Sequence, residues 1–74
     1  MRPFEIMTSV GTDTFRFGED FVDGEMRECW TWAGLEKLIR LGVWERRLDR
    51  RGTPLQKPPS VEAVRRLSTV RPLA

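Results

Sequence analysis

The stretch that decides the fold is FRFGEDFVDGEMRECWTW, from Phe15 to Trp32. At its centre, Asp23-Gly24 lies between alternating apolar side chains, which is a strong signal for a β-hairpin, because the favoured two-residue turn needs positive φ at both positions. Such a turn pairs Val22 with Glu25 and gathers apolar residues on one face, since side chains alternate along a strand. The predicted pairs on that face are Phe21 with Met26, Phe17 with Trp30, and Phe15 with Trp32.

A second turn agrees with this register. Residues 3–10, PFEIMTSV, alternate between apolar and polar and are followed by the turn-forming residues Gly11-Thr12-Asp13-Thr14. A four-residue loop there pairs Val10 with Phe15. The sequence therefore predicts a three-stranded antiparallel β-meander with strands at about 3–10, 15–22 and 25–32. The predicted core face consists of Phe4, Val10, Phe15, Phe17, Phe21, Met26, Trp30 and Trp32.

A helix over residues 19–29 is the alternative, because several apolar residues there also fall near one helical face. Gly24 would then lie in the helix interior, at a cost of about 1 kcal/mol, and the aromatic pairs would be lost. We therefore favour the strands.

Two helices are expected. The first covers about 33–41, with Thr31 as N-cap and Gly42 just after its end, and it packs on the aromatic face of the sheet. The second covers about 61–70 and begins after the N-cap Ser60. Together with the strands, these helices predict an α+β fold in a single small domain, residues 1–74.

Residues 43–57 carry the densest positive charge. As a helix, this stretch would place Arg46 near Arg50 and Arg47 near Arg51, which is unfavourable. We therefore predict a basic β-hairpin at about 43–57 that turns at Asp49-Arg50-Arg51-Gly52.

Composition narrows the chemistry. The chain has no His and one Cys, Cys29, so it lacks the commonest general base, an internal disulfide and a Cys-based zinc site. Facing carboxylates at Glu19 and Glu28 are the one enzymatic alternative, and we do not favour it. No apolar segment follows Arg2 as in a secretory signal, and none has the length of a membrane span. We expect a cytoplasmic protein that is not an enzyme, has no cofactor or metal, and does not bind membranes.

The charge is uneven along the chain. Residues 1–39 hold four basic and eight acidic side chains, whereas residues 40–74 hold nine basic and three acidic ones. Such asymmetry predicts an anionic partner for the second half. Eleven of the thirteen basic residues are Arg, which binds phosphate and carboxylate through paired donors, although a GC-rich genome would produce the same preference.

The segment from Leu35 to Leu55, LEKLIRLGVWERRLDRRGTPL, locally resembles the end of a winged helix-turn-helix domain. In that family a helix ends at Gly, and a basic hairpin, the wing, contacts the DNA backbone. The preceding helices of that fold are replaced here by predicted strands. The resemblance therefore implies a wing-like hairpin and does not assign the family.

Two binding functions remain. The first is contact with phosphates of DNA or RNA, for which the predicted residues are Arg46, Arg47, Arg50, Arg51, Lys57, Arg65 and Arg66. The second is a phage- or mobile-element-type inhibitor that occupies an acidic surface of a host protein or nucleoprotein complex. It would use the Arg cluster, a sheet edge that could also form a homodimer, or Trp44. The structural alternatives are a solvated charged surface and a Trp44 that seals the helix against the sheet.

Overall fold

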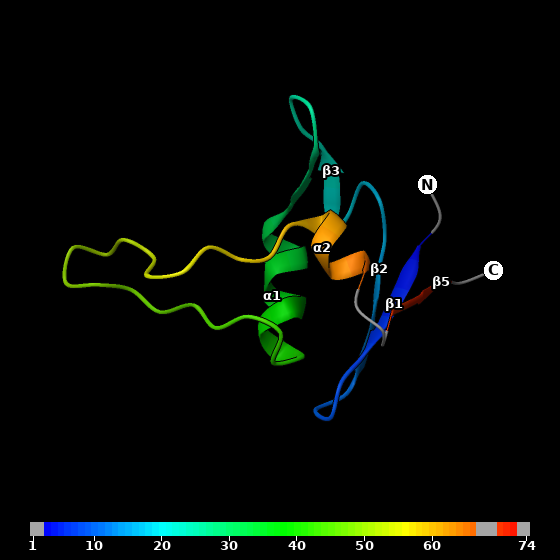
Figure 1. Cartoon of the computed structure of the whole chain (residues 1–74), viewed down its shortest axis with the longest axis horizontal. Helices are drawn as coiled ribbons and strands as arrows, with labels where there is room; N and C mark the ends of the chain where they lie inside the picture. Colours follow the sequence, from blue (N-terminus) through cyan, green and yellow to red (C-terminus); the bar gives the residue numbers. More distant parts are fainter. Residues whose placement is uncertain (1–2, 67–69, 73–74) are drawn as a thin grey trace.

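The computed structural model describes residues 3–66 and 70–72, and it confirms the α+β class (Figure 1). The elements, in chain order, are β1 (Phe4–Met7), β2 (Thr12–Phe15), β3 (Phe21–Asp23), β4 (Glu28–Trp30), α1 (Trp32–Arg40), α2 (Val61–Arg65) and β5 (Val70–Pro72).

The predicted meander is wrong, because its strands lie in two sheets. One sheet has the antiparallel order β2-β1-β5, and the other pairs β3 with β4. The predicted strand 15–22 is broken by a turn, in which the amide of Asp20 donates to the carbonyl of Arg16 at 2.9 Å. Gly18 adopts a φ of +89° within this turn, a conformation that other residues rarely take.

The first hairpin closes earlier than predicted. Thr8 and Gly11 exchange backbone hydrogen bonds of 2.8 and 3.2 Å, so the turn lies at residues 8–11. The Thr8 hydroxyl also donates to the carbonyl of Leu41 at 2.8 Å, a contact between residues far apart in the sequence. As a result, Phe15 pairs with Phe4 rather than with Val10.

The second hairpin has a longer loop than Asp23-Gly24 alone. The amide of Gly24 donates to the carbonyl of Arg27 at 2.7 Å, and Phe21 pairs with Trp30 rather than with Met26. In both hairpins the register differs from the predicted one by an even number of residues. Because side chains alternate with period two, an even shift exchanges partners but keeps each strand's inward face.

The helices follow their predicted caps. The hydroxyls of Thr31 and Ser60 accept hydrogen bonds from the amides of Gly34 and Ala63 at the starts of α1 and α2. Gly42, with a φ of +75°, follows the end of α1. The predicted second helix to about residue 70 is too long, because α2 ends at Arg65 and β5 begins at Val70 and pairs with β1. Residues 67–69 lie outside the described part.

The core differs from the predicted face. Phe4, Phe15 and Phe21 are buried, and Trp30 packs against them. The other four predicted core residues are exposed: Val10, Phe17, Met26 and Trp32. The core is completed by Ile6 of β1 and by side chains of the two helices and of the chain after α1, namely Leu38, Leu41, Trp44, Val61 and Val64.

A buried ion pair joins the turn between β2 and β3 to α1. The carboxylate of Asp20, 1% exposed, accepts from the Lys37 ammonium at 2.9 Å and from the amide of Arg16 at 2.8 Å. Lys37 also donates to the carbonyl of Thr14 at 2.6 Å. The helix approaches so closely that a Cβ at Gly34 would overlap the carbonyl oxygen of Asp20. The Asp20 turn is therefore held by both charge and contact.

Candidate functional site

The segment from Glu45 to Lys57, here called the Arg loop, is exposed at every residue and extends away from the helices and strands (Figure 1). The predicted strands of a hairpin do not form, since only one isolated bridge joins Leu48 to Pro54 among the residues described. Pro54 has no amide to donate, and an unsupported two-stranded hairpin is marginal in water. The loop still doubles back on itself, with the amide of Leu55 donating to the carbonyl of Arg47 at 2.8 Å.

The predicted turn of the loop is present. One carboxylate oxygen of Asp49 accepts from the amides of Arg51 at 2.8 Å and Thr53 at 2.9 Å. Gly52 has a φ of +81°, which the turn requires and which Gly adopts without strain. Asp49 therefore holds the backbone of the turn, and the turn places Arg50 and Arg51 at the tip of the loop.

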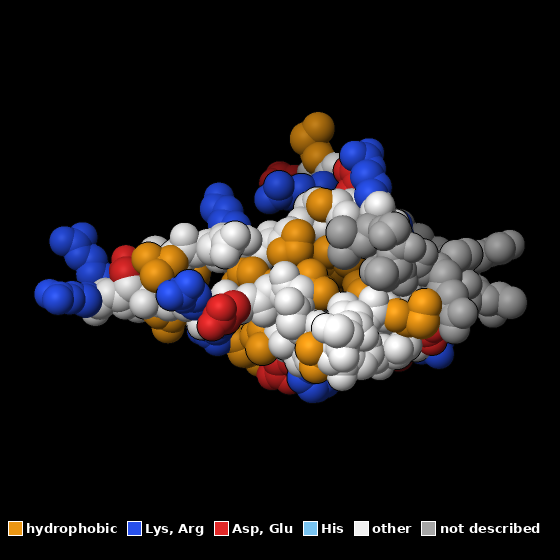
Figure 2. Space-filling view, turned by 60° about the horizontal axis from the view of Figure 1, so that its bottom comes forward, with side chains coloured by type: hydrophobic (Ala, Val, Ile, Leu, Met, Phe, Trp, Pro, Cys, Tyr) orange, Lys and Arg blue, Asp and Glu red, His pale blue; other side chains and the backbone are white. Residues whose placement is uncertain are grey.

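Three arginines of the Arg loop have no ionic partner in the described part of the chain. Within the described residues, no carboxylate lies within ion-pair distance of Arg47, Arg50 or Arg51. Figure 2 shows basic side chains gathered at the end of the projecting loop. By contrast, Arg40 pairs with Asp13 at 3.1 Å on the body of the molecule.

Trp44 is not available to a partner, because it lies in the core and is 8% exposed. Its indole Nε1 donates to the carbonyl of Gln56 at 3.2 Å, which ties the start of the Arg loop to its end. A second indole, that of Trp30, donates to the carbonyl of Pro59 at 2.6 Å. The alternative in which Trp44 seals the structure describes it better than the binding role.

The exposed indole is that of Trp32, which we predicted in the core. Trp32 is the first residue of α1 and is 53% exposed, and the guanidinium of Arg46 lies over its ring at 4.8 Å from the centroid. One feature of the sequence could have predicted that Trp32 lies outside the sheet. Thr31 as N-cap makes Trp32 the first helical residue, so it cannot also pair in a strand.

The remaining predicted residues lie in different surroundings. Lys57 is exposed at the end of the Arg loop. Arg66, which caps the end of α2, is exposed and paired with Glu62 four residues earlier. Arg65 is half-buried: its guanidinium lies 5.1 Å from the Phe4 ring centroid and 5.0 Å from that of Phe21. Arg65, which we predicted to contact phosphates, is therefore turned toward the core and bound to Glu28.

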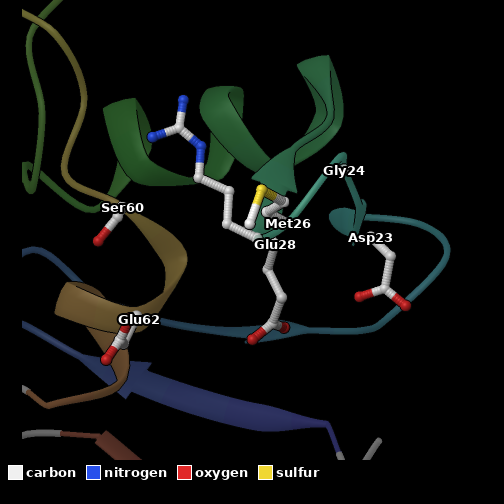
Figure 3. Close-up of a pocket in the computed structure, with 7 residues that line it drawn as sticks. Asp23, Gly24, Met26, Glu28, Ser60 and Glu62 are labelled. Carbon is white, nitrogen blue, oxygen red and sulfur yellow. The ribbon is translucent and has the colours of Figure 1, made fainter.

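Glu28 binds Arg65 at 2.9 Å, and it pairs across the hairpin with Asp23 rather than with Glu19. Glu19 lies exposed in the turn that precedes β3, so the facing carboxylates expected from the meander do not form. Next to Glu28 is an open groove of about 780 Å³, lined also by Asp23, Gly24, Met26, Arg27, Ser60 and Glu62 (Figure 3). In the described part of the chain, no group of three or more acidic or Cys residues is placed to hold a metal ion.

Comparison with known proteins adds no assignment, since no protein-family model, curated protein or solved structure matches the chain. Neither helix in the described part is long and apolar enough to cross a membrane.

Proposed function

We propose that this protein binds nucleic acid through the Arg loop, with Arg47, Arg50 and Arg51 contacting phosphates. The observation that carries the proposal is the absence of any carboxylate partner for these three arginines among the described residues, on a loop exposed throughout. Unpaired guanidinium groups close together attract a polyanion, and each can bind phosphate through two parallel hydrogen bonds.

Phosphate contacts give affinity without reading the sequence. The loop is exposed at every residue, so its arginines can contact a phosphate backbone at many positions along a strand. We therefore expect weak preference among sequences and a strong dependence on salt, because each contact releases condensed counterions.

The test is a titration of labelled DNA and RNA at two salt concentrations. Changing Arg47, Arg50 and Arg51 together to Ser should weaken binding to all sequences alike. It should also flatten the log–log salt dependence by about 0.9 per lost contact on duplex DNA, or about 0.7 on a single strand.

A matched control changes Arg16, Arg27 and Arg40 to Ser. These arginines are also exposed and their loss lowers the net charge by the same amount, but they lie on the body of the molecule. The control should bind nearly as well as the parent. Equal weakening by both triple variants would mean that net charge alone attracts the nucleic acid, and would overturn the assignment to the loop.

An acidic protein surface is the second candidate partner. Leu48 and Leu55 are 46% and 63% exposed beside the arginines, and phosphates make no use of such side chains. If the parent binds neither DNA nor RNA at either salt concentration, the nucleic-acid proposal fails. A protein complex that depends on the same three arginines would then support the alternative.

A further inference from the structure

The pair formed by Trp32 and Arg46 has no role in the core. The indole is 53% exposed at the beginning of α1, and the Arg46 guanidinium covers part of it, 4.8 Å from the ring centroid. A large aromatic side chain buries about 150–250 Å² when it packs in a core. The exposed half of the Trp32 side chain therefore leaves a large apolar area in contact with water. The same chain buries its other two indoles more fully and gives each nitrogen a backbone acceptor.

From this pair we infer that the protein prefers single-stranded nucleic acid, with one unpaired base stacked on the part of the Trp32 ring that Arg46 leaves open. The inference rests on the proposed function, because Arg47, Arg50 and Arg51 would hold other phosphates of the same strand. The result is a base–indole–guanidinium stack continued by phosphate contacts along the loop.

The preference follows from what each form of nucleic acid presents. In a duplex the faces of the bases are covered by their neighbours, and only phosphates, sugars and base edges can be touched. In a single strand a base can turn out and stack on an aromatic ring. An exposed indole in a protein that also contacts phosphates therefore adds affinity for a single strand and adds nothing for a duplex.

Arg46 differs from the other loop arginines in this respect. Its guanidinium lies over the Trp32 ring, 4.8 Å from the centroid, and makes a cation–π contact. Arg47, Arg50 and Arg51 have no such contact in the described structure. The contact between Trp32 and Arg46 is therefore present without a ligand, and the other three arginines of the loop are left for phosphates.

The experiment compares labelled oligothymidylate with a labelled duplex of the same length. The parent should bind the single strand more tightly, and the strand should quench its tryptophan fluorescence. Trp32→Ala should weaken single-strand binding by about 5- to 150-fold, the range that stacking of one base on an aromatic side chain contributes. Duplex binding should stay within about twofold of the parent, because the phosphate contacts remain.

Two further variants complete the test. Trp32→Phe keeps a ring and should retain part of the single-strand affinity, while most of the fluorescence quenching disappears. Met26→Ala removes a fully exposed apolar side chain from the β3–β4 loop and should leave both affinities unchanged.

The outcomes separate this inference from the proposed function. If Trp32→Ala binds oligothymidylate like the parent while the triple Arg variant does not, nucleic-acid binding stands and the stacking site is overturned. If Trp32→Ala weakens single-strand and duplex binding equally, the ring supports the loop and does not stack a base. If the parent binds neither probe, the proposed function fails, and the stacking site fails with it.

Discussion

The body of this protein, formed by its helices and strands, differs from the Arg loop in how its charged side chains are paired. In the body, Asp20 binds Lys37 and Glu28 binds Arg65, each at 2.9 Å and each at least partly buried. In the loop, Arg47, Arg50 and Arg51 have no carboxylate partner within the described structure, and the one nearby Asp holds backbone amides. Charges that serve the fold are matched and desolvated, whereas those left unmatched in solvent remain available to a partner.

The two regions also differ in how their backbones are held. The body is organised by aromatic contacts, in which Phe4 lies 5.4 Å from Phe15 and 5.5 Å from Phe21 between ring centroids. The loop is held by a few backbone hydrogen bonds and by Trp44 at its base. Stability should therefore reside in the body and binding in the loop, and the following variants test that division in order of decreasing effect on stability.

The largest effect should come from Phe21→Ala. Phe21 is fully buried and contacts three other aromatic rings, so its loss should cost about 3–5 kcal/mol, enough to unfold a domain of this size. Urea denaturation followed by circular dichroism measures this cost. Phe17→Ala is the comparison, because Phe17 is 42% exposed and should lose much less. Equal losses from the two variants would place Phe17 in the core after all.

A smaller loss is expected from Gly34→Ala. In an ordinary helix this change stabilises, because Ala is the better helix former. Here the added Cβ would overlap the carbonyl oxygen of Asp20, so we expect a loss of about 1–3 kcal/mol.

Ala33→Gly is the matched control in the same helix turn, and it should lose about 1 kcal/mol from helix propensity alone. Thermal melts of both variants would decide. Stabilisation by Gly34→Ala would show that α1 does not approach the Asp20 turn so closely.

The smallest effect on stability should come from changing Arg47, Arg50 and Arg51 together to Ser. These side chains are exposed and unpaired in the described structure, so the free energy of unfolding should change by no more than about 0.5 kcal/mol. Urea midpoints of the parent and the triple variant provide the measurement. A large decrease in the free energy of unfolding would mean that the loop arginines stabilise the fold, and would contradict the separation of stability and binding between the two regions.

The sequence by itself determined the features that depend on neighbouring residues. Thr31 and Ser60 cap helices, Gly42 ends one, and Gly52 allows the tight turn at the tip of the Arg loop, as their local chemistry predicts. The sequence also predicted that Phe4, Phe15 and Phe21 point into the core, because side chains alternate between the two faces of a strand. Such signals act over a few residues and need no knowledge of distant contacts.

Only the tertiary structure decided which residues meet. The first turn closes at Thr8, whose hydroxyl donates to the carbonyl of Leu41. The predicted strand after Phe15 is interrupted by the turn in which Asp20 binds Lys37. The same packing buried Trp44, left Trp32 at the surface and turned Arg65 inward onto Phe4. Strand register depends on contacts such as those of Thr8 with Leu41 and of Asp20 with Lys37, whose partners are separated by other helices or strands. Which indole is exposed depends on packing of the same long range. Local pattern therefore predicted the elements and the charged loop, and long-range packing selected the aromatic residue beside it.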